Sequence, residues 1–223
     1  MLTIIPTPLG NLKDITLRAL ESLKEAEAIL CEDTRRTRHL LSAFQIQKPL
    51  YRYQDYHPRN QEKILELLRS GKKLALVSDG GTPVISDPGA KLIARVREEK
   101  LPLTVLPGPS AVVTAVAGSG FPGDAFLFLG FLPRSLGKRK KILTQAKSLG
   151  LTLVLFESPY RLISLLESAL EIFEPTTQAV VARELTKVYE EWIPANLQEI
   201  YQTLKKRKEI LGECILLIGP PKK

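Results

Sequence analysis

The sequence predicts an α/β protein with two domains, and three observations lead to this expectation. Short β-branched runs alternate with amphipathic helical patterns through the first half of the chain, as in a mainly parallel sheet flanked by helices. The segment GSGFPGD (118–124) then breaks this alternation with glycines, a proline and an acid, which is typical of a linker. Beyond it, the apolar runs 178–184 and 188–193 are separated only by Leu185-Thr186-Lys187 and suggest an antiparallel hairpin, so we expect a mixed sheet there.

We therefore expect an N-terminal α/β domain over 1–118 and a C-terminal α/β domain with a mixed sheet over 119–223. In the first domain, short apolar runs predict strands at 3–5, 28–31, 50–52, 74–77 and 103–106. Apolar stripes such as Leu17, Leu20 and Leu23 predict helices at 16–24, 36–43, 61–70, 90–99 and 111–117. In the second domain, we expect strands at 126–132, 152–156, 178–184, 188–193 and 213–219, and helices at 138–149, 160–173 and 196–206.

Composition narrows the class of protein. Hydrophobic residues make up 44% of the 223 residues, which is enough for packed cores. Lysine and arginine outnumber aspartate and glutamate by 32 to 24, and the net charge of +8 weakly favours a polyanionic partner such as nucleic acid. Cys31 and Cys214 lie far apart in apolar stretches, as buried free thiols do. The sequence has only two histidines, and no close group of cysteines and histidines that could bind zinc. The chain start has no basic leader, and no stretch approaches the roughly 20 apolar residues of a membrane span. We expect a cytoplasmic protein with no metal and no membrane contact.

Polar, glycine-rich or proline-rich segments follow most of the expected strands. They are PTPLGN (6–11), EDTRRTR (32–38), SDGGTPVISDPG (78–89), PGPSA (107–111), ESPYR (157–161) and ARELTK (182–187). Turn chemistry and helix capping explain any one of them adequately. Because ligands bind beyond the carboxyl ends of the strands of an open α/β sheet, several such loops at one edge favour a large ligand site.

Other motifs are weaker. The pattern G-x-G-x-x-G at 118–123 follows a helix instead of a strand and contains Pro122, so we expect a linker and not a dinucleotide site. In EDTRRTR, the arginines Arg35 and Arg38 share one face of a helix start, where they are either solvated or available to a phosphate. The basic tracts KRKK (138–141) and KKRK (205–208) are typical of solvated helix faces, and with Pro133-Arg134 they could form an RNA-facing rim.

Seven motifs occur in order across nearly the whole chain: PTPLGNLKDITLRAL, EDTRRTRHLL, LVSDGGTPVISDPG, LPGPSA, GFLPR, FESPYR and VARELTKVYEE. Together they resemble the bacterial ribosomal RNA small subunit methyltransferase I family, which is similar in fold to the tetrapyrrole methylases. The resemblance implies a two-domain α/β enzyme, usually a homodimer, with its cofactor in a cleft between the domains. It also implies methylation of the ribose 2′-hydroxyl of a cytidine in the decoding region of 16S ribosomal RNA within the small ribosomal subunit, with S-adenosylmethionine as the methyl donor.

The motifs also imply the residues of the site. Those carried over as cofactor contacts are Pro8, Gly10, Asp79, Gly81, Thr82, Pro83, Ile85, Ser86, Ser110, Ala111, Phe156, Ala182 and Arg183. Some positions depart from the family pattern: Gly80 stands where alanine is usual, Tyr160 stands where histidine is usual, and YRYQDYHPRN (51–60), with His57, replaces a Tyr-His-Glu-His-Asn stretch. Residues expected to face RNA are Arg35, Arg38, Arg134, Lys138, Arg139, Lys140, Lys141 and Arg161.

A ribose hydroxyl is a poor nucleophile at neutral pH, so a base or hydrogen-bond acceptor should assist its attack. The candidate catalytic residues are Glu184, Lys187, Asp33 and Glu157, of which we favour the first two, and each of them could equally be a cap or an ion pair. Two alternatives remain open. A sister enzyme would methylate a precorrin- or uroporphyrinogen-type tetrapyrrole, and a non-enzymatic RNA-binding module would have lost its cofactor.

Overall fold

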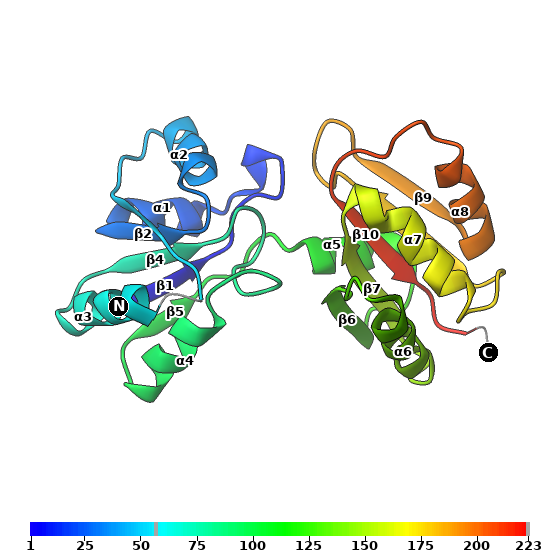
Figure 1. The fold of residues 1–223 in the computed structure, drawn as a ribbon. Coiled ribbons are helices and arrows are strands. Elements are labelled where there is room, and N and C mark those ends of the chain that lie inside the picture. Colours follow the sequence, from blue (N-terminus) through cyan, green and yellow to red (C-terminus); the bar gives the residue numbers. More distant parts are fainter. Residues whose placement is uncertain (56–57, 222–223) are drawn as a thin grey trace. The chain divides into compact units, whose positions relative to one another are not determined.

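The computed structural model describes residues 1–55 and 58–221, so His57 lies outside the described residues. The chain divides into two compact units, Met1–Ser110 (unit 1) and Ala111–Lys223 (unit 2), and each holds a five-stranded sheet (Figure 1). No helix in the described ranges is both long and apolar enough to cross a bilayer.

Unit 1 is built on an all-parallel sheet with the strand order β3-β2-β4-β1-β5. Its strands are β1 (Leu2–Ile5), β2 (Ala28–Cys31), β3 (Leu50–Arg52), β4 (Leu74–Val77) and β5 (Leu103–Val105). A 3-10 turn, η1 (Leu12–Asp14), and four helices connect them: α1 (Leu17–Glu25), α2 (Thr34–Ala43), α3 (Pro58–Arg69) and α4 (Ala90–Glu98). All five strands therefore end at one carboxyl edge, as the alternating sequence pattern predicts.

Alternating side chains of the strands build a core on each face of this sheet. Leu2 and Ile4 pack in a cluster with residues of α3 and α4, whereas Ile5 packs in a second cluster with residues of α1 and α2. Figure 1 shows the two helix pairs on opposite faces of the sheet. Because both faces are covered, the strands carry near-continuous apolar runs, and this explains why AILC and LALV could be identified as strands from the sequence.

Unit 2 is built on a mixed sheet with the strand order β6-β7-β10-β8-β9. Its strands are β6 (Phe126–Phe131), β7 (Thr152–Glu157), β8 (Gln178–Arg183), β9 (Glu191–Asn196) and β10 (Cys214–Ile218), of which β6 and β7 are parallel and the other neighbours antiparallel. Helices α6 (Leu136–Lys147), α7 (Pro159–Leu170) and α8 (Leu197–Lys205) cover one face, and α5 (Ala111–Ser119) covers the other. The α/β class with one parallel and one mixed sheet is thus confirmed.

Helix α5 lies in unit 2, so the division between the units falls before the 118/119 boundary expected from the glycine-rich segment. Its buried residues Val112, Ala115 and Val116 pack against strand residues of the second sheet. Gly118 closes this contact, because a Cβ added to it would lie 2.4 Å from a ring carbon of Trp192. The glycine is therefore a packing residue of unit 2.

The expected hairpin is present, but its second strand begins later than the sequence predicted. Strand β9 starts at Glu191 and not at 188, and its partner across the ladder is Arg183. In the connection, the Lys187 N–H donates to Glu184 O and the Glu190 N–H donates to Lys187 O, both within turns. These turn hydrogen bonds remove residues 188–190 from the ladder and leave Val188 and Tyr189 exposed at 94% and 75%.

Strand pairing brings the motifs of unit 2 to one edge. Glu157 at the end of β7 and Arg183 at the end of β8 both pair with Cys214, and Phe131 at the end of β6 pairs with Phe156. The segments that follow β6, β7 and β8 therefore leave the sheet on the same side. They contain GFLPR, FESPYR and ARELTK.

Candidate functional site

In unit 1, the first and third loops are joined by backbone hydrogen bonds. The Thr7 N–H donates to Gly81 O at 2.9 Å, and the Gly81 N–H donates to Thr7 O at 2.8 Å, which forms an isolated antiparallel bridge. The hydroxyl of Thr7 also donates to Ser78 O, and the hydroxyl of Ser78 donates to Gly81 O. Gly81 has a φ of 87°, a conformation that side chains of L-residues rarely adopt, so this bridge requires glycine.

Two further hydrogen bonds extend this loop platform. The Thr82 hydroxyl donates to Pro109 O at 2.9 Å, which joins the third loop to PGPSA. The Asp33 N–H donates to Asp79 Oδ1 at 3.2 Å, which joins it to EDTRRTR. The structure thus brings together four of the sequence-predicted loops at the carboxyl edge of one sheet, where open α/β sheets bind their ligands.

The third loop also holds unusual backbone conformations. Val84 and Ser86 have φ values of 78° and 67°, and Ile85 between them is exposed. Positive φ is uncommon for residues with a side chain and is a genuine outlier for a β-branched residue such as valine. Strain of this kind is concentrated at ligand sites. It occurs at the predicted cofactor position Ser86 and at Val84, the residues on either side of Ile85.

The remaining predicted cofactor positions of unit 1 lie in the loops of the same platform. Pro8 and Gly10 lie in the first loop, Pro83 is buried in the third, and Ser110 ends the unit. Gly80 has no positive φ, and a Cβ added to it would meet Pro8 O at 3.4 Å, an ordinary contact distance. The departure from alanine at this position therefore has little structural consequence.

The acidic residues of the platform are held by arginines. Asp33 caps α2 and accepts hydrogen bonds from the side chain and backbone of Arg35, which lower the pKa of Asp33 to about 2. Arg36 Nε lies 3.8 Å from Asp79 Oδ2. A carboxylate with so low a pKa is a weak general base, which disfavours Asp33 in that role. Arg35 pairs with the N-cap Asp33 although its side chain is largely exposed, and Arg38 is also exposed to solvent.

In unit 2, two predicted cofactor positions lie in the core and one in an ion-pair cluster. Phe156 packs edge-on against Phe128, with ring centroids 4.8 Å apart, and Ala182 is fully buried. Arg183 Nε donates to Glu191 Oε2 at 3.0 Å, and Arg207 donates to both oxygens of Glu191. The Arg207 hydrogen bonds, together with those of Arg183, lower the pKa of Glu191 to about 2. Ala111 begins the unit as the first residue of α5.

We expect Glu191→Gln to lower the stability of unit 2 at neutral pH by about 2 kcal/mol, allowing for the 29% exposure of the side chain. The pKa of Glu191 in the folded protein lies below its ordinary value of 4.5. The stabilisation by the ionised Glu191 is therefore complete above pH 4.5 and is lost as the pH falls towards 2. Urea unfolding followed by circular dichroism at neutral pH and near pH ~3 measures this loss. Glu174→Gln, an exposed carboxylate of the same unit, is the control. An equal stability difference at both pH values contradicts the prediction.

The ARELTK loop contains the two favoured catalytic candidates as an ion pair. Lys187 Nζ donates to Glu184 Oε1 at 2.7 Å and to Glu213 Oε2 at 3.1 Å. Burial alone would raise the pKa of Glu184, but the hydrogen bonds from Lys187 and the Glu213 N–H outweigh it and lower the pKa. Burial alone would lower the pKa of Lys187, but the hydrogen bonds and charges of Glu184 and Glu213 outweigh burial and raise it. At neutral pH this pair is a carboxylate and an ammonium, so Lys187 is a cation and not a base.

The conformation of this loop is strained and tightly enclosed. Glu184 and Thr186 have φ values of 52° and 66°. A Cβ on Gly212 would lie 2.3 Å from Glu184 Cδ, so the glycine makes room for the carboxylate. The buried hydroxyl oxygen of Thr186 has no hydrogen-bond partner among the described residues. A strained loop with an unsatisfied buried hydroxyl is typical of a functional site.

The fourth catalytic candidate, Glu157, is placed differently from the others. Its side chain is 0% exposed, Oε1 accepts from the Ser158 N–H, and Oε2 lies 3.1 Å from Arg161 Nη2. No donor of the described residues is aligned with Oε2 for a hydrogen bond, although the ion-pair distance is short. The ion pair with Arg161 stabilises this carboxylate all the same, because electrostatic attraction depends little on angle. Glu157 therefore holds Arg161 beside the edge of the sheet.

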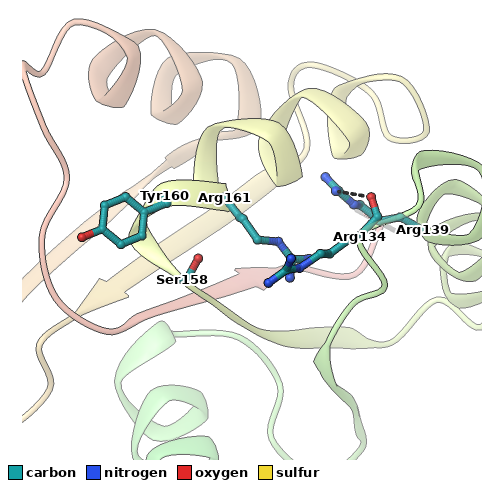
Figure 2. A pocket seen from close by; sticks show the side chains of 5 residues that line it. All are labelled: Arg134, Arg139, Ser158, Tyr160 and Arg161. Atoms are coloured by element: carbon teal, nitrogen blue, oxygen red, sulfur yellow. Dashed lines mark hydrogen bonds between the residues drawn. The ribbon is translucent and has the colours of Figure 1, made fainter.

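Three arginines surround a hollow of about 430 Å³ at this edge. Figure 2 shows its lining residues, Arg134, Arg139, Ser158, Tyr160 and Arg161. Arg161 Nη2 donates to Leu132 O at 2.7 Å, and Arg134 is exposed with no carboxylate of the described residues within ion-pair distance. These two of the predicted RNA-facing residues are thus brought together.

Arg139 differs from the expectation of an RNA-facing residue. It is 4% exposed, and its guanidinium donates to Ser164 O, the hydroxyl of Ser168 and Arg134 O. Helix geometry explains the difference, because Arg139, Leu143 and Ala146 lie on one helix face and are all buried. Of the lysines in the same tract, Lys140 pairs with Glu171, while Lys138 and Lys141 are exposed.

Several residues of these clusters were missed by the sequence reasoning. Arg36 pairs with Asp79, and Glu191 pairs with Arg207, and both pairings depend on contacts between loops or strands that sequence spacing does not show. Tyr160 was noted only as a departure from a motif. Its position beside Arg161 in a segment after a strand was a signal that could have identified it. The described residues bring together no group of three or more histidine, cysteine, aspartate or glutamate side chains suited to a metal ion.

Comparison with known proteins agrees with these features. Residues 1–201 match the family Tetrapyrrole (Corrin/Porphyrin) Methylases. Proteins named ribosomal RNA small subunit methyltransferase I are similar over almost the whole chain. One from Hydrogenobaculum sp. (strain Y04AAS1) is 45% identical over 98% of this chain and 95% of its own, and one from Thermotoga maritima is 45% identical over 98% and 97%.

Solved structures of low sequence identity share the fold. A uroporphyrin-III C-methyltransferase from Thermus thermophilus, complexed with S-adenosyl homocysteine, superposes with a TM-score of 0.71 at 17% identity and covers 98% of this chain and 96% of its own. A diphthine synthase superposes with a TM-score of 0.76 at 15% identity and covers 98% and 89%. The resemblance seen in the seven motifs is confirmed by the full-length relatives: the chain belongs to the tetrapyrrole (corrin/porphyrin) methylase family and, within it, to the group of ribosomal RNA small subunit methyltransferases I.

Proposed function

We propose that the protein transfers a methyl group from S-adenosylmethionine to the ribose 2′-hydroxyl of a cytidine in the decoding region of 16S ribosomal RNA. The observation that carries this proposal is the 45% identity to relatives named ribosomal RNA small subunit methyltransferase I over 98% of the chain. The loop platform of unit 1 and the charged edge of unit 2 supply suitable chemistry. We also propose that the enzyme is a cytoplasmic homodimer and that its substrate is RNA within the small subunit.

The loop platform suits a cationic methyl donor. S-adenosylmethionine, when bound, supplies an activated methyl group on a sulfonium. Asp79 provides a carboxylate that complements a positive charge, and Gly81 permits close approach of the backbone. Thr82 and its hydrogen bond to Pro109 O fix the relative position of two loops that would contact the donor. Phe156, Ala182 and Arg183 of unit 2 are the other cofactor positions that the motifs imply.

The ARELTK loop suits activation of the hydroxyl. A ribose hydroxyl needs a hydrogen-bond acceptor as it attacks, and Glu184 is ionised at neutral pH because of its lowered pKa. Lys187, which stays protonated, would hold a neighbouring phosphate or stabilise charge. The two residues are held within one turn by a direct hydrogen bond, so their geometry is fixed before substrate binds.

Mapping of the modified nucleotide tests the proposed function. The purified protein is incubated with tritium-labelled S-adenosylmethionine and either small ribosomal subunits that lack the modification, free 16S RNA, or uroporphyrinogen. We expect label in 16S RNA at a linkage that resists alkaline hydrolysis, because a 2′-O-methyl group blocks attack by the 2′-oxygen. Label in the tetrapyrrole alone would instead identify a sister enzyme. Absence of cofactor binding by calorimetry would identify a non-enzymatic RNA-binding module.

A further inference from the structure

The hollow lined by Arg134, Arg139, Ser158, Tyr160 and Arg161 has the size of a small-molecule site. Its volume is about 430 Å³, within the range of roughly 300–1,000 Å³ that ligand pockets occupy. The residues come from the segment after β6, from α6, and from the start of α7, and they lie within unit 2. The hollow is therefore complete in one folded unit.

The arginines around it have different duties. The guanidinium of Arg139 donates its hydrogen bonds to the Ser164 carbonyl and hydroxyl and to the Arg134 carbonyl. It therefore stabilises the wall of the hollow and is not available to a ligand. Arg161 is oriented by Leu132 O and by the buried Glu157, which leaves part of its fork of donors unused. Arg134 has no carboxylate partner among the described residues. The hollow thus presents an oriented guanidinium and a second one free to adjust, an arrangement suited to phosphate.

The start of α7 adds to this preference for an anion. Ser158 is the N-cap of this helix of 12 residues, and its hydroxyl makes no capping hydrogen bond. The N-terminus of a helix carries the positive end of the helix dipole, which stabilises anions bound there. The hydroxyl is therefore available to a ligand in the hollow.

Tyr160 gives the site a second chemical character. Its side chain is an exposed aromatic at 89%, and it forms no ring pair with another aromatic side chain of the described residues. Figure 2 shows its ring on one side of Ser158, with the guanidinium groups of Arg134 and Arg161 on the other. An exposed flat ring on one side of a site and guanidinium groups on the other form a combination that suits single-stranded nucleic acids, with a base on the ring and a phosphate on the cations.

We propose that this hollow is a nucleotide subsite for single-stranded RNA, in which Arg134 and Arg161 hold a backbone phosphate and the ring of Tyr160 stacks on the adjacent base. The inference rests on the proposed function, and it adds Tyr160 as a substrate-binding residue. Glu157 and Arg139 are positioning residues, because they hold Arg161 and the Arg134 segment without reaching the ligand themselves. The subsite fixes one nucleotide of an unpaired strand, so duplex RNA with its bases stacked inside is not bound there.

Binding of a fluorescent single-stranded RNA of about 20 nucleotides with the decoding-region sequence tests the proposal. Anisotropy is measured over a series of salt concentrations, with the same RNA annealed to its complement for comparison. We expect Tyr160→Ala to weaken single-strand binding by about 5- to 100-fold and Tyr160→Phe to restore it. We expect Arg134→Ala to reduce the slope of log K against log salt by about 0.7, the value for one phosphate contact. Arg97→Ala, an exposed arginine on α4 in unit 1, removes the same charge and is expected to leave the slope unchanged.

Three outcomes would overturn the subsite. RNA binding by the Tyr160 and Arg134 variants that matches Arg97→Ala means that the hollow does not touch RNA. Weakened binding of S-adenosylmethionine by calorimetry in the same variants means that the hollow belongs to the cofactor. Equal losses for duplex and single-stranded RNA mean that no base stacks on Tyr160. If the wild-type enzyme methylates 16S RNA in all these cases, the proposed function stands and only the subsite fails, whereas a wild-type protein that neither binds nor methylates RNA removes both.

Discussion

Gly81→Ala is expected to weaken S-adenosylmethionine binding by at least about tenfold, whereas Gly80→Ala leaves it nearly unchanged. Gly81 has a φ of 87°, and an L-residue in the left-handed region costs roughly 1–2 kcal/mol, which the loop can relieve only by moving. Movement would break the bridge to Thr7 and displace the platform. Gly80 has no such conformation, and a Cβ there meets Pro8 O at 3.4 Å.

Isothermal titration calorimetry of the two neighbouring variants measures this difference. They add the same methyl group one residue apart, so composition and hydrophobicity are matched. Circular dichroism and thermal unfolding show whether unit 1 remains folded in each. Equal cofactor affinities for both variants, with both folded, would remove the Thr7–Gly81 bridge from the cofactor site.

Glu184→Gln is expected to lower the rate of methyl transfer at saturating cofactor by about 10²-fold, within the usual range for loss of a general base or acceptor. Glutamine has the same shape and keeps an oxygen for the Glu213 N–H, so the strained loop and the contact with Gly212 are retained. What is lost is the negative charge beside Lys187. Cofactor affinity is expected to stay within about twofold, because Glu184 is not among the proposed cofactor contacts.

Single-turnover assays with both substrates saturating measure the effect, and Glu213→Gln is the matched control. Glu213 also pairs with Lys187, but its side chain is 72% exposed, so its charge is screened by solvent. The pH profile adds a second readout. Because the pKa of Glu184 lies below its ordinary 4.5, the acid limb due to this group lies below pH 4.5, and the rate does not fall from this cause near neutrality. Unchanged turnover in the variant would remove Glu184 from the catalytic residues.

Much of unit 1 could be predicted from the sequence because its sheet is buried on both faces. Continuous apolar runs such as LALV identify the strands, and their parallel order follows from the intervening helices. The same reasoning predicted that the loops after the strands share one edge. It could not predict which atoms join them, such as the Thr7–Gly81 bridge, because hydrogen bonds between distant loops leave no periodic signal.

Unit 2 was predicted less completely, for reasons that specific residues show. The tract KRKK was interpreted by its charge, but successive residues of a helix point in different directions, and Arg139 shares its face with Leu143. The start of β9 was placed too early because Val188 and Tyr189 have strand-forming side chains, whereas turn hydrogen bonds decide their conformation. The roles of Arg183 and Glu191 depend on their pairing across two strands, which no local pattern records.

The contact between Gly118 and Trp192 has a practical consequence. Trp192 is the single tryptophan of the sequence and lies in unit 2, and its indole N–H donates to Glu190 Oε1 at 2.9 Å, in the turn that follows ARELTK. The fluorescence of the indole therefore reports on unit 2 alone, whereas circular dichroism reports on both units. A difference between the melting temperatures measured by the two methods would show that the units unfold separately. The same ring is a label-free optical sensor for ligands that change the loop beside it.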